Sequence, residues 1–210
     1  MDTNIKQKQS TFDYHQLLLS WFSPSFPIGS FNFSHGLEAA IEYKFVCDKI
    51  TLEEWIKHLI INGSGKTDSI LLAHAYEGKN VNELAFALCA SKERWTETLN
   101  LGKAFCKNIN DNWKYKIDKN LAYPIAIGKA GKYFKIPLEK LLIAFLQSFA
   151  SNLINVGIKH IPLGQSEGQK ILINFLPIIK KQANIYKIAQ VEDLGSSAFL
   201  SDLSSMYHET

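Results

Sequence analysis

Residues 63–67 combine the residue types that hold phosphate, because they read G-S-G-K-T. A phosphate-binding loop uses backbone N–H groups and a lysine for this purpose, and its pattern needs a first glycine five positions before the second one. That position holds Ile60, and the residues before it have the spacing of an amphipathic helix rather than of a buried strand. We therefore interpret the segment as a glycine turn between two helices and not as a nucleotide site.

Two histidine–glutamate pairs have a spacing that suits metal binding on a helix. His35 and Glu38 stand three residues apart, and Glu54 and His58 stand four apart, so each pair can share one helix face. A tight metal site needs three or four ligands that converge. The sequence shows no third ligand for either pair, and it predicts no metal bound by this chain.

The residues of nucleophilic catalysis do not form a recognisable motif. The chain has no G-x-S-x-G sequence, and its three cysteines, Cys47, Cys89 and Cys106, are widely separated. Their odd number and spacing exclude a disulfide framework within one chain and fit a reducing cytosol. A hydrolase whose serine, histidine and acid meet only in the folded chain stays open as an alternative.

Residues 103–140 hold nine lysines with interleaved aromatic residues, such as Trp113, Tyr115 and Tyr133. Lysines beside stacking aromatics can follow a phosphate backbone. The net charge of the whole chain is only +3, and amphipathic helices of a lysine-rich chain give the same pattern. Binding of a nucleic acid or an acidic partner through this region is the second alternative, and the solvated helix face is the preferred interpretation.

The elements that must position these residues are helices. Residues 51–54 read T-L-E-E, which indicates a capping box with Thr51 as N-cap and Glu54 as its partner. Apolar residues then recur at helical spacing, and Pro137 opens a long central helix at its first position. The same analysis predicts further helices at 12–22, 34–44, 66–78, 81–90, 92–109, 122–134 and 166–176, the last ended or kinked by Pro177.

The sequence therefore predicts an all-α fold, a single-domain bundle of about eight to ten helices without a significant sheet. A length of 210 residues fits one domain, which we divide into a flexible N-terminus (1–11), a helical body (12–191) and a C-terminal segment (192–210). The run 141–158 is long enough to consider a membrane span, but its polar residues argue for a core helix. No signal peptide is evident.

The linker 23–33 is unusual for its apolar residues and stiffness. It holds two prolines, a glycine and three phenylalanines between two helices. Proline lowers the entropy lost when such a segment is ordered. The phenylalanines could enter a partner's groove or fill the chain's own core, and both uses remain open.

Three segments resemble the UreF family of urease accessory proteins. Residues 21–38 read W-F-S-P-S-F-P-I-G-S-F-N-F-S-H-G-L-E and resemble the opening signature of that family. Residues 161–169, I-P-L-G-Q-S-E-G-Q, are similar to its P-L-G-Q turn, and residues 193–203, D-L-G-S-S-A-F-L-S-D-L, to its C-terminal segment. The three matches occur in the family's order and reach over most of the chain.

The resemblance implies an all-helical cytoplasmic protein that forms a homodimer and is not an enzyme. The family implies partners, namely UreD (also called UreH), the GTPase UreG and apo-urease, and a role as the adaptor that couples GTP hydrolysis to nickel insertion. It implies that nickel and GTP act through the partners, with no cofactor held tightly by this chain. Neither nucleic acid nor a membrane is implied as a partner.

The resemblance also places candidate partner contacts in two segments. The first is the C-terminal one, and the second is the start of the helix after the 162–164 turn. Internal packing is an equally good use of Phe199 and Leu200, because a terminal amphipathic segment can fold back on its own bundle. The candidate contacts are Gln165, Gln169, Ser196, Ser197, Phe199, Leu200, Tyr207 and His208.

The opening signature and the arginine content give two further expectations. Ser34 is expected to cap a helix, with His35 and Glu38 in its first turn, and Gly36 to allow close approach of another backbone. Arg94 is the only arginine, and it stands in a predicted amphipathic helix without a motif. We therefore expect control of UreG by docking rather than by an arginine finger.

Overall fold

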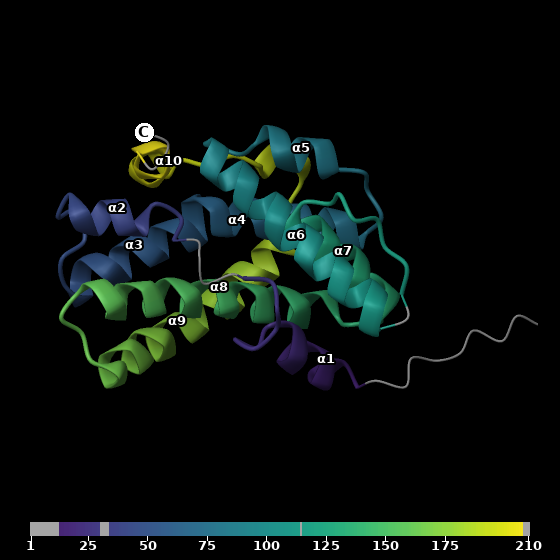
Figure 1. Cartoon of the computed structure of the whole chain (residues 1–210), viewed down its shortest axis with the longest axis horizontal. Coiled ribbons are helices and arrows are strands. Elements are labelled where there is room, and N and C mark those ends of the chain that lie inside the picture. Colours follow the sequence, from purple (N-terminus) through teal and green to yellow (C-terminus); the bar gives the residue numbers. More distant parts are fainter. Residues whose placement is uncertain (1–12, 30–33, 114, 208–210) are drawn as a thin grey trace, which may run out of the picture.

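A computed structural model describes residues 13–29, 34–113 and 115–207 of the chain. The described part consists of helices with turns between them and contains no strand, which confirms the all-α prediction (Figure 1). The helices are α1 (Tyr14–Trp21), α2 (Leu37–Glu42), α3 (Lys49–Asn62), α4 (Ser64–Tyr76), α5 (Asn82–Ala87), α6 (Lys92–Asn112), α7 (Tyr123–Tyr133), α8 (Leu138–His160), α9 (Gln165–Tyr186), the 3₁₀ helix η2 (Val191–Asp193) and α10 (Phe199–Tyr207).

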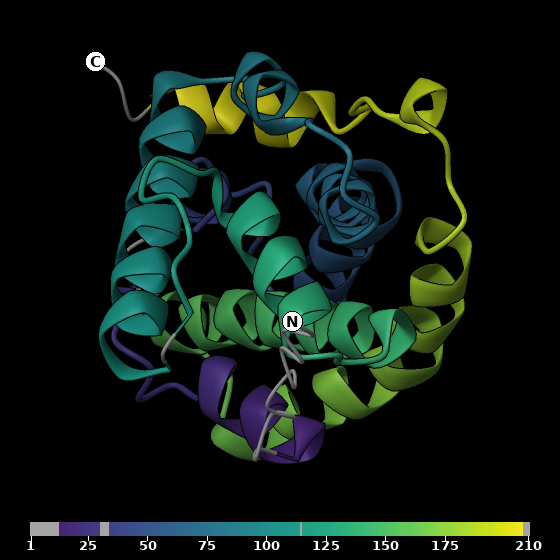
Figure 2. The same cartoon turned by 90° about the vertical axis from the view of Figure 1, so that its right-hand side faces the viewer.

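Helices α4 and α7 form the centre of the bundle. Figure 2 shows them surrounded by α6, α8 and α9, with α5 and α10 along one edge. The two central helices approach closely at Gly128, where a Cβ would lie 2.4 Å from the carbonyl oxygen of Leu72. Alanine at position 128 would push the two helix backbones apart, so the glycine permits the tight packing of the centre.

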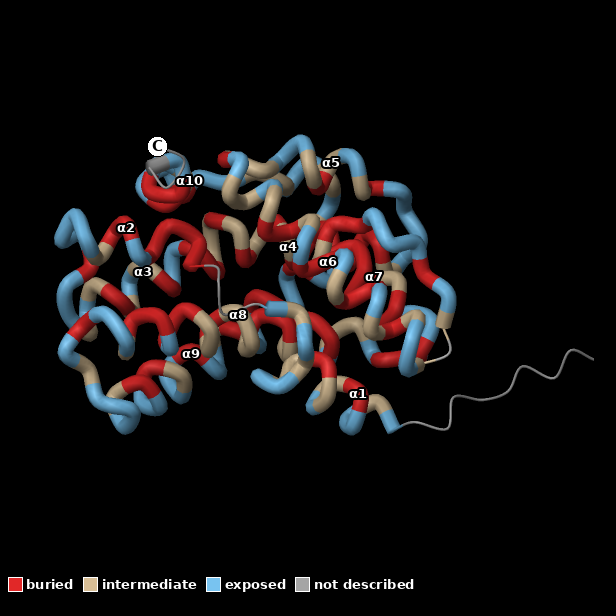
Figure 3. The backbone as a smooth tube through the Cα atoms, viewed as in Figure 1, coloured by how far each residue is buried: buried red, intermediate tan, exposed pale blue. Residues whose placement is uncertain are grey.

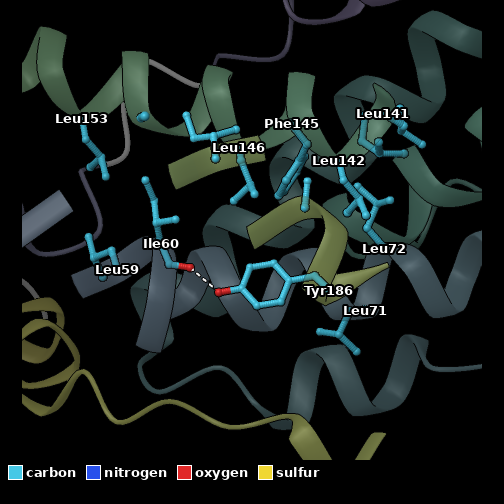
Figure 4. Close-up of a cluster of buried hydrophobic side chains, with 14 of the residues drawn as sticks. Leu59, Ile60, Leu71, Leu72, Leu141, Leu142, Phe145, Leu146, Leu153 and Tyr186 are labelled. Carbon is cyan, nitrogen blue, oxygen red and sulfur yellow. Dashed lines mark hydrogen bonds between the residues drawn. The ribbon is translucent and has the colours of Figure 1, made fainter. Parts of the chain in front are cut away.

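Helix α8 has more buried hydrophobic residues than any other described helix, and its buried positions are drawn in red in Figure 3. Its predicted stripe is confirmed, because Leu141, Leu142, Leu146 and Leu153 are fully buried. Figure 4 shows them packed with α4 and with Tyr186 of α9, whose hydroxyl donates a hydrogen bond of 2.7 Å to the Ile60 carbonyl. Burial of side chains of this size contributes about 1.5–3 kcal/mol each, so α8 anchors the fold.

The glycine turn at residue 63 is confirmed, and the predicted capping box before it is not. Gly63 ends α3 and begins α4 as their shared cap. Helix α3 begins before Thr51, and Asp48 is its N-cap. The Asp48 carboxylate accepts a hydrogen bond of 2.9 Å from the Thr51 backbone N–H. The Thr51 hydroxyl in turn contacts the Asp48 backbone N–H at 3.1 Å. The sequence prediction missed this because threonine took the partner's place in the box.

Of the two predicted effects of Pro177, an end or a kink of the helix, the end is wrong, because α9 continues to Tyr186 with Pro177 inside it. Proline removes the hydrogen bond to the carbonyl four residues earlier, here that of Ile173. Both residues are exposed, so water can satisfy that carbonyl. Buried residues beyond the proline, including Ile179 and Ala183, hold the rest of the helix on the bundle.

The opening signature adopts a tighter geometry than predicted. Helix α2 begins at Leu37, so Ser34 and His35 precede it, and Gly36 is its N-cap. The Ser34 hydroxyl still accepts from the Glu38 backbone N–H, at 3.4 Å. Both His35 (φ +52°) and Gly36 (φ +76°) are left-handed. The expectation that His35 lies in the first helical turn is therefore wrong.

Helix α8 is the one described helix whose length and composition would allow it to cross a membrane. More than half of its most apolar window, 56%, is buried inside the bundle. The core helices of soluble proteins pass the same test. This helix is therefore accounted for by the packing of the core.

Candidate docking surface

Hydrogen bonds of the residues just before α10 attach the C-terminal segment to the bundle and start the helix. The Ser197 backbone N–H donates to the carbonyl of Asn62 at the end of α3, at 2.9 Å. The Ser196 hydroxyl accepts from the Ala198 backbone N–H at 3.1 Å and donates to the Asp202 carboxylate at 3.0 Å. Ser196 therefore acts as an N-terminal capping residue of α10, although it lies before the first residue of the helix.

The two faces of α10 differ in an unexpected way. Its inner face packs on α2 and α6 and is made of small residues: Ala198, which precedes the helix, and Ser201, Ser204 and Ser205. Its outer face is apolar and exposed, and we call it the C-terminal apolar face, defined by Phe199, Leu200, Leu203 and Met206.

Phe199 is 73% exposed and Leu200 is 53% exposed. These residues recur at the spacing of one helix face. An exposed stripe of large apolar side chains marks an interaction site more often than chance.

A hollow of about 500 Å³ lies beside the C-terminal apolar face. It is lined by Met206 of α10 and by the start of α6, including Trp95, whose side chain is 44% exposed. Tryptophan in a hollow beside apolar side chains is typical of the anchor positions of protein interfaces. The hollow therefore extends the candidate surface from α10 onto α6.

Six of the eight predicted contact residues belong to the C-terminal segment, and the structure describes the side chains of four of them. Ser196 and Ser197 cap and tie down α10, so they shape the surface rather than form it. Phe199 and Leu200 do not pack internally; both point their side chains to solvent. The backbone of Tyr207 closes α10, whereas its side chain and all of His208 lie outside the described residues.

The other two predicted contacts, Gln165 and Gln169, are exposed in the first turns of α9. The start of α9 and the helix α10 lie at opposite sides of the bundle, α9 below and α10 above (Figures 1 and 2). The structure therefore does not bring the two predicted groups together.

A cluster of buried ionisable groups lies beneath α10, which the sequence analysis did not find. Arg94 of α6 donates to Glu97 on the same helix and, at 3.1 Å, to Asp68 of α4. Glu97 also lies 3.3 Å from Nε2 of His35. The side chains have little contact with solvent, since that of Arg94 is 12% exposed and that of Glu97 is 4% exposed. We call His35, Asp68, Arg94 and Glu97 the buried ionic cluster.

Burial and shared charge set the protonation of this cluster. Burial raises the pKa of Asp68, and it raises the pKa of Glu97 to about 7, although Arg94 opposes both shifts. Burial, followed by the charge of Arg94, holds the pKa of His35 well below its usual range. Burial disfavours the charge of Arg94, but the two carboxylates outweigh it and raise the pKa of Arg94. At neutral pH the cluster therefore contains a guanidinium and an uncharged imidazole.

His35 connects Ser64 and Glu97 in a line that resembles a catalytic triad. Ser64 Oγ lies 3.3 Å from His35 Nδ1, on the opposite side of the ring from Glu97. His35 and Glu97 line a cavity of about 60 Å³, room for a few water molecules, whereas Ser64 lines a different cavity of about 40 Å³. A nucleophile needs its base and its substrate in one space. The line therefore positions His35 rather than supporting hydrolysis.

Neither candidate histidine–glutamate pair forms an ion pair within the described residues. Glu38 lies 3.9 Å from His160 of α8 rather than beside His35. His58 Nε2 lies 3.4 Å from the Ser197 carbonyl, and Nδ1 accepts from the Asn62 side-chain amide at 3.3 Å, rather than pairing with Glu54. Within the described residues, no group of three or more histidine, cysteine, aspartate or glutamate side chains could hold a metal ion.

Comparison with known proteins gives a consistent result. Residues 46–176 match the family model described as UreF. The urease accessory protein UreF of Cereibacter sphaeroides is 40% identical over 92% of this chain and 93% of its own length. That of Roseobacter denitrificans is 35% identical over 92% of this chain and 89% of its own. The protein named urease accessory protein UreF 1 of Brucella canis is 37% identical with similar coverage.

Proposed function

This chain belongs to the UreF family of urease accessory proteins, and from that premise we propose that it is a non-catalytic adaptor in urease maturation. In this proposal the chain bridges UreD (UreH) and the GTPase UreG and couples GTP hydrolysis to nickel insertion into apo-urease. It acts in the cytoplasm as a homodimer. Nickel and GTP are handled by the partners, and no cofactor is held tightly by this chain.

The observation that carries the proposal is the C-terminal apolar face. A helix that buries serines and exposes phenylalanine and leucine gains little from its own bundle, whereas it can bury large apolar area against a partner. Residues 193–203, which include the start of this helix, also resemble the C-terminal segment of the family. We therefore assign the face and the hollow beside Trp95 to the contact with UreD.

The first experiment removes the apolar side chains that the contact would use. The double variant Phe199→Ser, Leu200→Ser should lose at least tenfold in affinity for UreD, measured by size exclusion and by titration, because truncated anchors cost 1.4 kcal/mol or more. The matched control is Ile50→Ser, Ile188→Ser, which removes two comparably exposed apolar residues outside α10. Wild-type affinity in a folded Phe199, Leu200 variant would falsify the assignment.

The buried position of Arg94 supports control of UreG through docking. An arginine finger must reach the phosphates of another protein, but the Arg94 guanidinium is paired with Asp68 and Glu97 inside the bundle. The variant Arg94→Lys keeps the positive charge in the cluster and removes the planar fork. UreG turnover stimulated by this variant should stay within about threefold of wild type, whereas a finger would lose at least a hundredfold.

One observation favours the alternative partner class. Lys116, Lys119, Lys132 and Lys135 are exposed around Tyr115 and Tyr133, and none of these lysines makes an ion pair within the described residues. The two tyrosine rings stack on each other at 3.9 Å, so each has one face already covered. Steep, salt-dependent retention on a DNA or RNA column would support this function in place of the adaptor.

A further inference from the structure

The C-terminal helix rests on a backbone turn that only a few residues could form. Residues His35 and Gly36 are both left-handed, with φ +52° and +76°. A Cβ on Gly36 would lie 2.8 Å from the carbonyl oxygen of Ser201 and 3.0 Å from the backbone nitrogen of Ser205. The backbone of α10 therefore sits directly on this turn, as expected for Gly36, and its seating depends on the shape of the turn.

The side chain of His35 holds that turn in place. Its ring lies 3.3 Å from Glu97 Oε1 on one side and 3.3 Å from Ser64 Oγ on the other. The edge of the ring packs against Phe149 of α8, with centroids 4.7 Å apart. A neutral imidazole satisfies both polar neighbours in one tautomer, by donating from Nε2 and accepting at Nδ1. The ring thus connects the turn to α4, α6 and α8.

Helix α10 is joined to the His35 turn and to the N-terminal cap of α6 by two of its serines. The Ser201 hydroxyl of α10 donates to the backbone carbonyl of His35 at 3.1 Å, in a buried position. Ser205 Oγ lies 3.0 Å from Ser91 Oγ, and Ser91 is the N-cap of the helix that carries Arg94 and Glu97. The Ser201 hydroxyl therefore ends on the backbone of His35, and the Ser205 hydroxyl, which also donates to the Asp202 carbonyl of its own helix at 2.8 Å, reaches the N-cap of α6.

We propose that His35, held by Glu97 and Arg94, is a positioning residue that latches α10 onto the bundle and thereby sets how the C-terminal apolar face is presented. The most deeply buried residues of α10 are serines, whereas Leu203 and Met206 are only partly covered, at 36% and 44% exposed. Apolar burial therefore does not account for the seating of the helix alone, and hydrogen bonds and the shape of the turn contribute to it. Loss of the latch releases α10 while the rest of the bundle stays folded. The consequence for partner binding rests on the proposed function, but the seating of α10 does not.

Hydrogen exchange of the full-length chain tests the latch without any partner. The variant His35→Asn keeps a residue that tolerates left-handed backbone but is too short to reach Glu97 and Ser64. Amides of residues 199–207 should then exchange at least tenfold faster, with less than a threefold change in α8. A merely structural role for His35 would accelerate exchange in α6 and α8 as well, and that result would overturn the proposal.

Two further variants keep the test decisive if His35→Asn does not fold. Ser201→Ala removes the hydrogen bond from the α10 side, and it should also accelerate exchange in 199–207 at least threefold. The control Lys49→Met breaks the exposed ion pair of Lys49 with Glu167, which joins α3 to α9, and should leave 199–207 unchanged. Unchanged exchange of α10 in Ser201→Ala, with either fate of the His35 variant, contradicts the latch.

A binding measurement separates this proposal from the assignment of the docking surface. If α10 exchanges faster in the latch variants while UreD binds with wild-type affinity, the latch stands and the docking role of α10 fails. If the exchange of α10 is unchanged while the Phe199, Leu200 variant loses UreD, the docking role stands and the latch fails.

Discussion

Helices α8 and α10 are both amphipathic, but α8 buries its apolar face and α10 buries its polar face. Helix α8 buries leucines such as Leu146 and leaves polar residues such as Gln147 and Asn155 toward its groove with α1. Helix α10 buries Ser201 and Ser205 and exposes its large apolar residues. An amphipathic sequence pattern therefore indicates that a helix has an apolar face and a polar face. The fold decides which of the two faces is buried.

This difference gives the two helices different roles, one in stability and the other in binding. The apolar side of α8 supplies stability, because its area is removed from water when the chain folds. The apolar side of α10 remains in water in the isolated chain, so any gain from it must come on binding. Stability measurements on variants of the two helices, and of the turn and the cluster between them, test this division.

The largest effect should follow from a cavity under α8. Leu146→Ala removes a fully buried side chain and should lower the free energy of unfolding by about 3 kcal/mol. Urea unfolding followed by circular dichroism measures the loss. A change below about 1 kcal/mol would show that α8 is not the anchor described here.

A smaller effect should follow from crowding the turn beneath α10. Gly36→Ala adds a methyl group against the α10 backbone at a left-handed position, and should cost about 1–2 kcal/mol. Gly78→Ala is the matched control, because Gly78 is also left-handed but has open space around its Cβ direction. If both variants lose the same stability, backbone conformation alone explains the cost, and the contact with α10 contributes nothing.

The buried ionic cluster should make stability depend on pH. The folded-state pKa of Glu97 is raised to about 7, above its unfolded value of 4.5, so the folded chain binds more protons between these values. This contribution is fully present below pH 4.5 and is lost as pH rises through 7.

Between pH 6 and pH 8 the wild type should therefore lose about 1 kcal/mol relative to Glu97→Gln, which cannot titrate. Parallel urea titrations at the two pH values measure this difference. A difference between wild type and variant that stays constant from pH 6 to pH 8 would show that Arg94 dominates and that Glu97 stays ionised throughout.

The smallest effect should come from the outer face of α10. Leu200→Ser replaces a large apolar side chain that already lies in water, and unfolding free energy should change by less than about 0.5 kcal/mol. The thermal midpoint measures it beside that of Leu146→Ala. A loss as large as that of the α8 variant would mean that Leu200 is buried in the solution state, for example in a homodimer.

Sequence patterns predicted the helices that build the core. Helices α3, α6, α7 and α8 were predicted within a few residues, because their apolar spacing and their burial agree. The predictions failed where one local contact decides the outcome. Thr51 is a partner of the cap rather than the cap, and Pro177 is tolerated because its side of α9 faces water.

The docking surface and the cluster beneath it were only partly predictable. Resemblance to the family pointed to Phe199 and Leu200, but α10 was not predicted as a helix, since its small inner residues give no core signal. The cluster joins His35, Asp68 and the pair Arg94 and Glu97 from three separate elements. No spacing in the sequence connects these positions, although a lone arginine among 23 basic residues was a usable sign.

The serine-lined underside of α10 also bears on how the protein must be produced. A chain made in excess of its companion keeps four large apolar side chains in water on one short helix. Two such chains can cover them only by meeting each other, so free copies should self-associate as their concentration rises. The docking proposal therefore predicts that synthesis together with the partner keeps more of this protein in solution than synthesis alone.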